Sequence, residues 1–540
     1  MVHIRSGCSA VRVAYLNGVQ VVAGSNPVIP TITLIGGLAC RSFFVFRFRV
    51  YGHGKKRLYK KATSRDVEKK NNLGDFVMKK YGFDFPKNIR KTFLTDLEET
   101  WYLPYLAKNK GLAMGSIKRS NFGEYEMAVH YLTSVLEEAA AVNKVAVYNI
   151  DHMGQIRIWG KDAVALLNRS LGASFSDMKI GSCKYTLLLN ENGGVQDDMI
   201  VMRIKEDEFI AVVNAGHDIT DEISRDGETI RMIADIDRIM AQKRDGEEVE
   251  AEDISEDLVK VDVQGPLSYR LIKEVYSDKV LRNRNNPEKN MNFFSFNEVE
   301  LDSHTYYFSR TGYTNRWGWE IYIPKAKAEG DFKKIVSKAL DLGGLLVGLG
   351  GRDENRMSAG AFGLPLMGAE YDPEHNPINA PLFEAAVDLS KDEFIGKKAL
   401  VKEIEKGVSK SLNIIISEGI VSGRGVYRDG KRLGKVTSSI NSPNLSQDQR
   451  LAIGSKRKNV NDPAGTAAIG LAWLYENPFE QDSEGKDITI YDGNPIRIPV
   501  QFFREDSDQQ PNGSPVLGYI TCEGVSVATA PKALKNIEKL

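Results

Sequence analysis

The residues best placed to do chemistry are two adjacent carboxylates, Asp197 and Asp198, and an amide further along the chain, Asn214. Residues 199–204 and 209–213 are runs of strand-forming residues separated by a charged turn, which predicts an antiparallel hairpin. The start of the first strand then lies opposite the end of the second, and the three polar side chains share one rim. A carboxylate there could stabilise positive charge that develops during a reaction. The alternative is a solvated turn, the commoner role of acidic pairs at strand entrances.

The sequence around this hairpin resembles one protein family in detail. Residues 181–201, GSCKYTLLLNENGGVQDDMIV, resemble a pattern of the glycine-cleavage T-protein (aminomethyltransferase) family. That pattern is Tyr-Thr, a short apolar run, and Asn-x-x-Gly-Gly-x-x-Asp-Asp-x-Ile-Val. It is kept here at Tyr185, Thr186, Asn190, Gly193, Gly194, Asp197, Asp198, Ile200 and Val201. A match of this length is far more specific than a lone glycine motif.

Two further segments resemble motifs of the same family, in the same order. The family's Gly-Tyr-Thr-Gly-x-x-Gly-x-Glu is kept at Gly312, Tyr313, Thr314, Gly318 and Glu320. Its Gly-Leu-Gly-Ala-Arg-Asp-x-x-Arg-x-Glu-Ala-Gly is kept at Gly348, Leu349, Gly350, Arg352, Asp353, Arg356, Ala359 and Gly360. The chain departs from these motifs at Asn315, Arg316, Trp317 and Ser358. The resemblance covers about residues 124–503.

The resemblance implies an α+β chain with a three-lobed aminomethyltransferase-like folate-binding fold, containing a ferredoxin-like layer and a C-terminal all-β barrel domain. The expected divisions are a leader that is non-native or disordered, the folate-binding domain, the barrel domain and a tail. Their boundaries are residues 1–77, 78–400, 401–505 and 506–540.

The resemblance also implies roles for single residues around tetrahydrofolate. Asp197 is expected to be the catalytic carboxylate, placed near the folate nitrogen that gains or loses the carbon unit. Asp198 is expected to be its structural neighbour, because adjacent strand residues point to opposite faces, and to belong to the folate-binding residues. Asn214 is expected to offer both a donor and an acceptor to the pterin ring.

The remaining expected ligand contacts come from the other motifs. Glu320 is expected to accept hydrogen bonds from the amide-like edge of a pterin. Arg352 is expected to touch the substrate, with Arg356 on the same helical face as its structural companion. Tyr185 and Tyr313 complete the expected binding residues, and no metal is expected.

Three functions remain open from the sequence. The first is transfer of an aminomethyl group from a lipoylated H-protein to tetrahydrofolate, giving methylene-tetrahydrofolate and ammonia. The second is a tetrahydrofolate-dependent demethylase acting on a sulfonium, methylamine or methoxy compound, which the departures from the motifs favour. Trp317 and Trp319 could pack against a cationic donor, although tryptophans in a hairpin more often belong to the core. The third is a folate-binding regulatory protein that transfers nothing.

Composition excludes some other classes. The chain has 540 residues, of which 42% are hydrophobic and 27% charged, as expected for a globular protein of several domains. Residues 1–77 carry 13 Lys and Arg against 3 Asp and Glu, which leaves 59 basic and 69 acidic residues for 78–540. An acidic body argues against nucleic-acid binding. Four cysteines without metal-ligand spacing favour a reducing compartment. We therefore expect a cytoplasmic protein with no nucleic-acid or membrane partner.

The leader differs from the rest of the chain. The apolar stretch 28–40 is interrupted by Pro30 and is too short for a membrane helix. Residues 24–27 match the in-frame translation of a transfer-RNA T-arm, and the codons for residues 73–75 can contain a ribosome-binding sequence. We therefore expect translation to begin at Met78, with a disordered basic tail as the alternative.

Periodicity predicts the elements that position these motifs. Helices are expected at 124–142, 161–171, 267–276 and 331–342, a strand at 258–263, and barrel hairpins at 425–437 and 488–500. The charge-rich segment 225–256 is expected to be a solvated insertion. His152, at the end of a strand, is expected to be a packing or hydrogen-bonding residue rather than a base.

Overall fold

The computed structural model divides the chain into two compact units, residues 9–72 and residues 1–8 with 73–540. The predicted leader lies outside the described residues, apart from the two-residue strands β1 (Tyr15–Leu16) and β2 (Val19–Gln20). All other described elements belong to the larger unit. The described residues are 15–16, 19–20, 89–110, 117–133, 137, 140–141, 143–225, 228–314, 316–358, 363–407, 410–442, 445, 447–452, 467–480, 482–483, 490–491 and 494–521.

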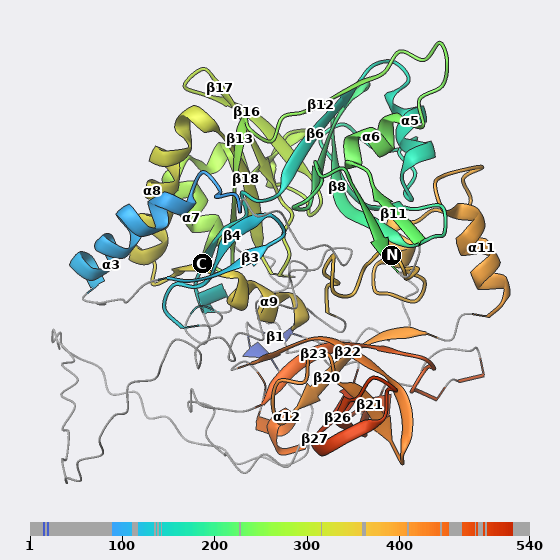
Figure 1. Cartoon of the computed structure of the whole chain (residues 1–540). Helices are drawn as coiled ribbons and strands as arrows, with labels where there is room; N and C mark the ends of the chain where they lie inside the picture. The colour runs from blue at the N-terminus through green and yellow to red at the C-terminus, as the bar shows by residue number, and fades with distance from the viewer. Residues whose placement is uncertain are drawn as a thin grey trace, which may run out of the picture. The chain divides into compact units, whose positions relative to one another are not determined.

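The first sheet of the larger unit has six strands, covered on its outer side by the helices α7 (Ser268–Val275) and α8 (Lys325–Asp341) (Figure 1). The succession β13-α7-β17-β18-α8-β19 is a split βαβ arrangement, with β5 inserted between β13 and β19. This confirms the expected ferredoxin-like layer. In spatial order the strands are β16 (Phe296–Leu301), β17 (His304–Ser309), β18 (Gly318–Pro324), β13 (Leu258–Gln264), β5 (Ala146–Asn149) and β19 (Leu345–Val347).

Strand β13 sits in the middle of this sheet and is buried along its whole length. Val259, Val261 and Val263 belong to the core that also contains α7 and α8. Because side chains alternate along a strand, Lys260 and Asp262 face the other side, away from the helices. Two charged residues are thereby carried into the interior of the protein.

The second sheet is antiparallel and is covered on its outer side by α5 (Ala163–Ser170) and α6 (Asp235–Met240). Met202 and Ile210 of this sheet pack with Leu258 and Tyr322 of the first sheet, so the two sheets face each other. The strands are β12 (Glu250–Asp253), β6 (Gly154–Trp159), β9 (Glu208–Val213), β8 (Val195–Lys205) and β7 (Cys183–Leu189).

The expected helix at 124–142 was wrong over its first half. Tyr125–His130 is the strand β4, paired with β3 (Lys118–Phe122) through a turn at Gly123, whose φ is +60°. The adjacent residues Met127 and Ala128 are both buried, so the strand is enclosed on both faces. A short strand of this kind has no alternating pattern, which is why its apolar residues matched a helix.

The expected solvated insertion at 225–256 was also wrong in part. Helix α6 buries Ile239 in the second core, and β12 pairs with β6 at the edge of the second sheet. Glu250 and Glu252 of β12 are exposed, and exposed charged residues are common on edge strands. The segment therefore supplies an edge strand and a packed helix to the second sheet, while its β11 (Glu228–Met232) pairs with β10 (Asp221–Arg225) in a separate two-stranded sheet.

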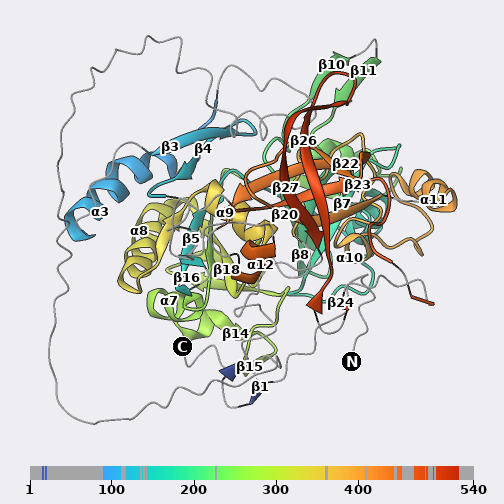
Figure 2. The same cartoon turned by 90° about the horizontal axis from the view of Figure 1, so that it is seen from below.

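The C-terminal part is a closed six-stranded barrel, as expected (Figure 2). The predicted boundary at residue 505 was wrong, because β27 lies in the expected tail and closes the barrel by pairing with both β26 and β20. Leaving it out would expose two strand edges. The strands, in order around the barrel, are β20 (Ser411–Ser417), β23 (Ala468–Leu474), β22 (Lys431–Asn441), β21 (Gly425–Arg428), β26 (Arg497–Glu505) and β27 (Pro511–Thr521).

No helix of the described residues is long and apolar enough to cross a membrane.

Shorter elements connect the two sheets and the barrel. The remaining elements are α2 (Thr95–Leu97), the π-helix η2 (Glu98–Tyr102), α3 (Leu103–Lys110), β10 (Asp221–Arg225), β11 (Glu228–Met232), η3 (Asp278–Leu281), β14 (Arg282–Asn283), β15 (Asn286–Asn290), α9 (Leu349–Met357), α10 (Phe383–Ala386), α11 (Lys397–Glu405), α12 (Gln447–Ala452), β24 (Ile490–Tyr491) and β25 (Asn494–Pro495).

Candidate functional site

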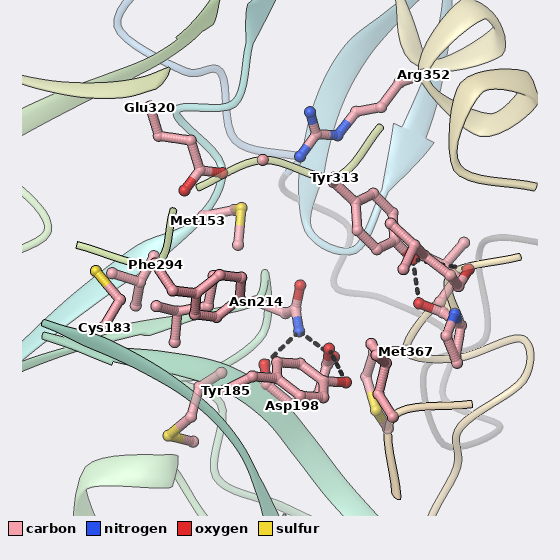
Figure 3. A pocket seen from close by; sticks show the side chains of 18 of the residues that line it. Met153, Cys183, Tyr185, Asp198, Asn214, Phe294, Tyr313, Glu320, Arg352 and Met367 are labelled. Carbon is pink, nitrogen blue, oxygen red and sulfur yellow. Dashed lines mark hydrogen bonds between the residues drawn. The ribbon is translucent and has the colours of Figure 1, made fainter. Parts of the chain in front are cut away.

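A cavity of about 510 Å³ is lined by the two facing sheets and by loops that include residues 312–313, 316 and 364–367. Its walls are largely apolar, and the few polar groups stand at opposite ends (Figure 3). This is the usual build of a site for a small organic molecule, with a flat apolar slot and polar groups that set orientation. The apolar lining includes Met153, Met199, Ile200, Val212, Phe294, Leu366 and Met367.

Asp198, Asn214 and Tyr185 form one polar end of the cavity. In the β8–β9 hairpin Ile200 pairs with Val212, which places Asp198 opposite Asn214 as the sequence predicts. The Asn214 amide nitrogen lies 2.8 Å from Asp198 Oδ1, and the Tyr185 hydroxyl donates to Asp198 Oδ2 at 2.9 Å. The carboxylate is thus held from both sides, in one orientation at the cavity wall.

Asp197 does not line the cavity. Its side chain is fully buried, and it accepts hydrogen bonds from the Asn214 backbone nitrogen at 3.0 Å and side-chain nitrogen at 2.9 Å. Asp197, the expected catalytic carboxylate, therefore lies outside the cavity lining. Asp197 holds Asn214 in position, and Asp198 is the carboxylate that faces the cavity.

The side chain of Asn214 differs from expectation in a related way. Its amide nitrogen is directed at the two carboxylates, and Figure 3 shows the amide oxygen turned toward the cavity. Asn214 can therefore accept a hydrogen bond from a ligand, but the donor half of the expected pair is already used by the protein.

Glu320 and Lys260 form the other polar end, on the first sheet. Glu320 Oε2 accepts a hydrogen bond from Thr311 at 2.6 Å, and Glu320 Oε1 lies 3.5 Å from the ammonium of Lys260. Both side chains are almost fully buried and both line the cavity. A ligand of this cavity would therefore meet a carboxylate at each end.

Arg352 enters the cavity from α9, as predicted. Its guanidinium donates to Asp262 Oδ2 at 2.7 Å and lies 5.3 Å from the ring centre of Tyr313. Tyr313 lines the same wall, and its hydroxyl donates to the carbonyl of Pro365. Burial raises the pKa of Tyr313 well above its usual value, so the hydroxyl stays protonated and serves as a donor. The predicted residues Tyr185, Asp198, Asn214, Tyr313, Glu320 and Arg352 therefore share one cavity.

His152 lies in the cavity wall, packed edge-to-face on Phe122 with ring centres 4.9 Å apart. Its Nδ1 is buried, with no hydrogen-bond partner among the described residues. Burial, together with the charges of Arg352 and Lys260, lowers the pKa of His152 to about 3. The ring is therefore neutral at physiological pH and a poor base, in keeping with the packing role expected for it.

Sequence reasoning did not single out Lys260 as a site residue and gave no binding role to Arg316, although both line the cavity. The signal for Lys260 was the alternation of valine with polar residues along β13, which a central strand rarely shows. Arg316 is buried, and its Nε donates to Asn355 at 3.0 Å. Trp317 and Trp319, in contrast, belong to the core. The described residues contain no cluster of His, Cys, Asp or Glu suited to a metal ion.

The fold and the site together define a class of protein: a mixed α/β chain with a closed barrel and an internal cavity that has a carboxylate at each end. Residues 113–391 match the family described as the GCVT N-terminal domain. An aminomethyltransferase of Corynebacterium jeikeium is 30% identical over 354 residues, covering 62% of this chain and 85% of the relative. One of Desulfitobacterium hafniense is 32% identical over 339 residues, covering 62% and 86%.

A solved structure agrees. The glycine cleavage system aminomethyltransferase T from Bartonella henselae matches with a TM-score of 0.57 at 22% identity, covering 80% of this chain and 96% of that chain. At this identity the likeness shows the fold alone. Together with the sequence relatives, these matches show that the chain belongs to the aminomethyltransferase family, a family of transferase enzymes.

Proposed function

We propose that this protein transfers one-carbon units to tetrahydrofolate and that its cavity holds the folate. The observation that carries the proposal is the pairing of Asp198 with Asn214 and Tyr185 at one end and Glu320 at the other. The family resemblance implies a pterin held by Glu320 and by a carboxylate near its reacting nitrogen, and it assigns that second carboxylate to Asp197. The family membership of the chain supports the same activity.

The residues present fit a folate. A pterin is a flat ring with hydrogen-bonding atoms on its rim, and the cavity has apolar walls with polar groups at its ends. The carboxylate of Glu320 and the amide oxygen of Asn214 can accept hydrogen bonds from ring N–H groups. The buried Nδ1 of His152, without a partner in the described residues, is a further polar atom in the wall.

Tetrahydrofolate supplies the nitrogen that accepts the carbon unit, and the protein supplies position and charge. We propose that Asp198, rather than Asp197, orients this nitrogen and stabilises positive charge on it. Tyr185 and Asn214 hold the carboxylate in one orientation, so no reorganisation is needed during the reaction. The surrounding apolar walls exclude water and strengthen the interaction.

For the donor we propose an aminomethyl group carried by a lipoylated H-protein, with methylene-tetrahydrofolate and ammonia as products. The relatives are named aminomethyltransferases, which supports an aminomethyl donor. Arg316 favours a second candidate, demethylation of a small methylated compound. It adds a buried cation to the cavity wall at a position where the chain departs from the family motif, and it could bind an anionic group of such a donor.

The test is the mass of the folate product formed by the full chain with aminomethylated H-protein, and separately with a panel of methyl donors. We expect methylene-tetrahydrofolate from the H-protein. Methyl-tetrahydrofolate from a small donor would establish the demethylase. Tight folate binding without any product would indicate a regulatory protein.

Two matched variants test which of the two carboxylates is catalytic. Asp198→Asn is expected to lower kcat by roughly 100- to 1,000-fold, because it removes the charge that faces the reacting nitrogen. Asp197→Asn makes the same chemical change one residue away, and should lower the melting temperature while lowering kcat by less than roughly tenfold. The reverse pattern would return the catalytic role to Asp197.

A further inference from the structure

The least explained group in the cavity is the ammonium of Lys260. The side chain is 1% exposed. Its nitrogen lies 3.6 Å from the sulfur of Met153, 3.5 Å from Glu320 Oε1 and 5.2 Å from the ring centre of Tyr322. A lysine ammonium carries three N–H donors, and neither a thioether nor a carboxylate at 3.5 Å is a strong acceptor partner.

The carboxylates near Lys260 already accept hydrogen bonds from other residues. Asp262, two residues along the same face of β13, accepts hydrogen bonds from Arg352 and Gln264, each at 2.7 Å. Glu320 Oε2 is bonded to Thr311. Burial of an incompletely bonded ammonium is costly, and it is reflected in a lowered pKa of Lys260, opposed by the charge of Glu320. A ligand acceptor in the cavity would offset that cost.

Lys260 and Glu320 present a donor and an acceptor side by side. Their nearest atoms are 3.5 Å apart, and both residues line the cavity. A carboxylate alone is complementary to two adjacent N–H groups. A carboxylate beside an ammonium is instead complementary to an N–H next to a carbonyl oxygen.

We propose that Lys260 and Glu320 together recognise the N3–H and C4=O edge of the pterin, and that Lys260 selects 4-oxo over 4-amino pteridines. This rests on the proposed folate binding and names the part of the ring that the first sheet recognises. The Lys260 ammonium donates to the C4 oxygen, and Glu320 accepts from N3–H. In a 4-amino pteridine the oxygen is replaced by an amino group and N3 carries no hydrogen. Two donors then face each other at position 4 in a buried site, and Glu320 loses the N–H from which it accepts.

The experiment compares tetrahydrofolate with 4-amino-4-deoxy-tetrahydrofolate, which differ in the group at C4 and in the hydrogen on N3, by equilibrium binding to the full chain. The wild-type protein is expected to prefer the 4-oxo ligand by roughly 100-fold, because a buried donor is left unpaired with the 4-amino ligand. In Lys260→Met the ratio should fall by at least roughly tenfold, since the 4-oxo ligand loses a partner and the 4-amino ligand no longer meets a cation. The part of the preference that Glu320 exerts through N3–H should remain.

Lys184→Met is the matched control. Lys184 also lines the cavity, but its ammonium donates to the backbone carbonyl of Ser174 at 2.6 Å. The preference should therefore stay at its wild-type value. Lys260→Gln replaces Lys260→Met if the latter does not fold. Its amide can turn to serve either ligand at position 4, and the preference should again fall by at least roughly tenfold.

The outcomes separate this proposal from the one on which it rests. If the wild-type chain binds neither ligand, the proposed folate function fails and this inference fails with it. If tetrahydrofolate binds but the 4-oxo preference is absent, or keeps its wild-type size in both Lys260 variants, folate binding stands and the role of Lys260 is overturned.

Discussion

At the scale of the residue, the sequence located the polar cluster but misplaced one of its members. The hairpin pattern brought both carboxylates to Asn214, as the structure confirms. Alternation shows that Asp197 and Asp198 face opposite sides, but not which side holds the cavity. Strand β8 is buried on both faces, against helices on one and the cavity on the other, so hydrophobicity could not decide.

The buried ring of His152 predicts a pH dependence of stability. Its pKa falls from 6.5 to about 3 on folding, so between these values the unfolded chain binds the extra proton. Its contribution is therefore fully present above pH 6.5 and is lost as the pH falls. Relative to His152→Asn, the wild-type protein should lose about 1.4 kcal/mol of unfolding free energy per pH unit of acidification in this range.

Chemical denaturation at several pH values between 7.5 and 4.5 measures this difference in unfolding free energy. The pH at which the difference sets in should agree with the expectation to within roughly one unit. His375→Asn is the comparison of opposite sign, because Asp372 raises the pKa of that half-exposed histidine. Its stabilising contribution is present at low pH and lost as the pH rises. Parallel curves for wild type and His152→Asn would show that His152 is protonated equally in both states.

At the scale of the element, helix α9 joins the cavity to the barrel. Arg352 points into the cavity. Arg356, one turn later, donates to Asp353 at 2.6 Å, to Glu370 at 3.0 Å and to Ser438 of β22 at 2.8 Å. The sequence predicted both arginines on one helical face, with Arg356 as the structural one. It could not predict Glu370 and Ser438, because contacts across long sequence separations leave no local pattern.

Replacing Arg356 is expected to destabilise this joint. Arg356→Met leaves Glu370, whose side chain is 0% exposed, as an unpaired buried charge. The free energy of unfolding should fall by about 3–5 kcal/mol. Arg244→Met, which breaks an exposed ion pair with Glu393, should change it by less than about 1 kcal/mol. Equal losses in the two variants, measured by denaturant unfolding, would contradict a special role for the α9 joint.

At the scale of the whole molecule, the order of the elements was predictable and the closure of the barrel was not. The hairpin β21–β22 carries a strong Asp-Gly turn signal, and the structure confirms it. Strand β27 was missed because Pro511, Gly513 and Pro515 interrupt its apolar pattern, and such residues normally argue against a central strand. Its role follows from ring closure, which only the complete set of strands defines.

Truncation tests the importance of that closure. A chain that ends at Glu505 lacks β27 and leaves β20 and β26 without their shared partner. We expect it to aggregate and to lose the barrel's unfolding transition in calorimetry, because two open strand edges are exposed. A chain that ends at Thr521 keeps every barrel strand and should retain the transition. A soluble, cooperatively unfolding chain ending at Glu505 would show that closure is dispensable.

The origin of the cavity walls has a consequence for how ligands act on the protein. The walls come from segments spread between Phe122 and Ala385, and no single element supplies both polar ends. A ligand of this cavity therefore binds only chains in which all these segments have assembled. By mass action, a ligand at 100 times its dissociation constant adds about 2.7 kcal/mol to the folded state. In a cell, the supply of that ligand would set the fraction of newly made chains that escape proteolysis.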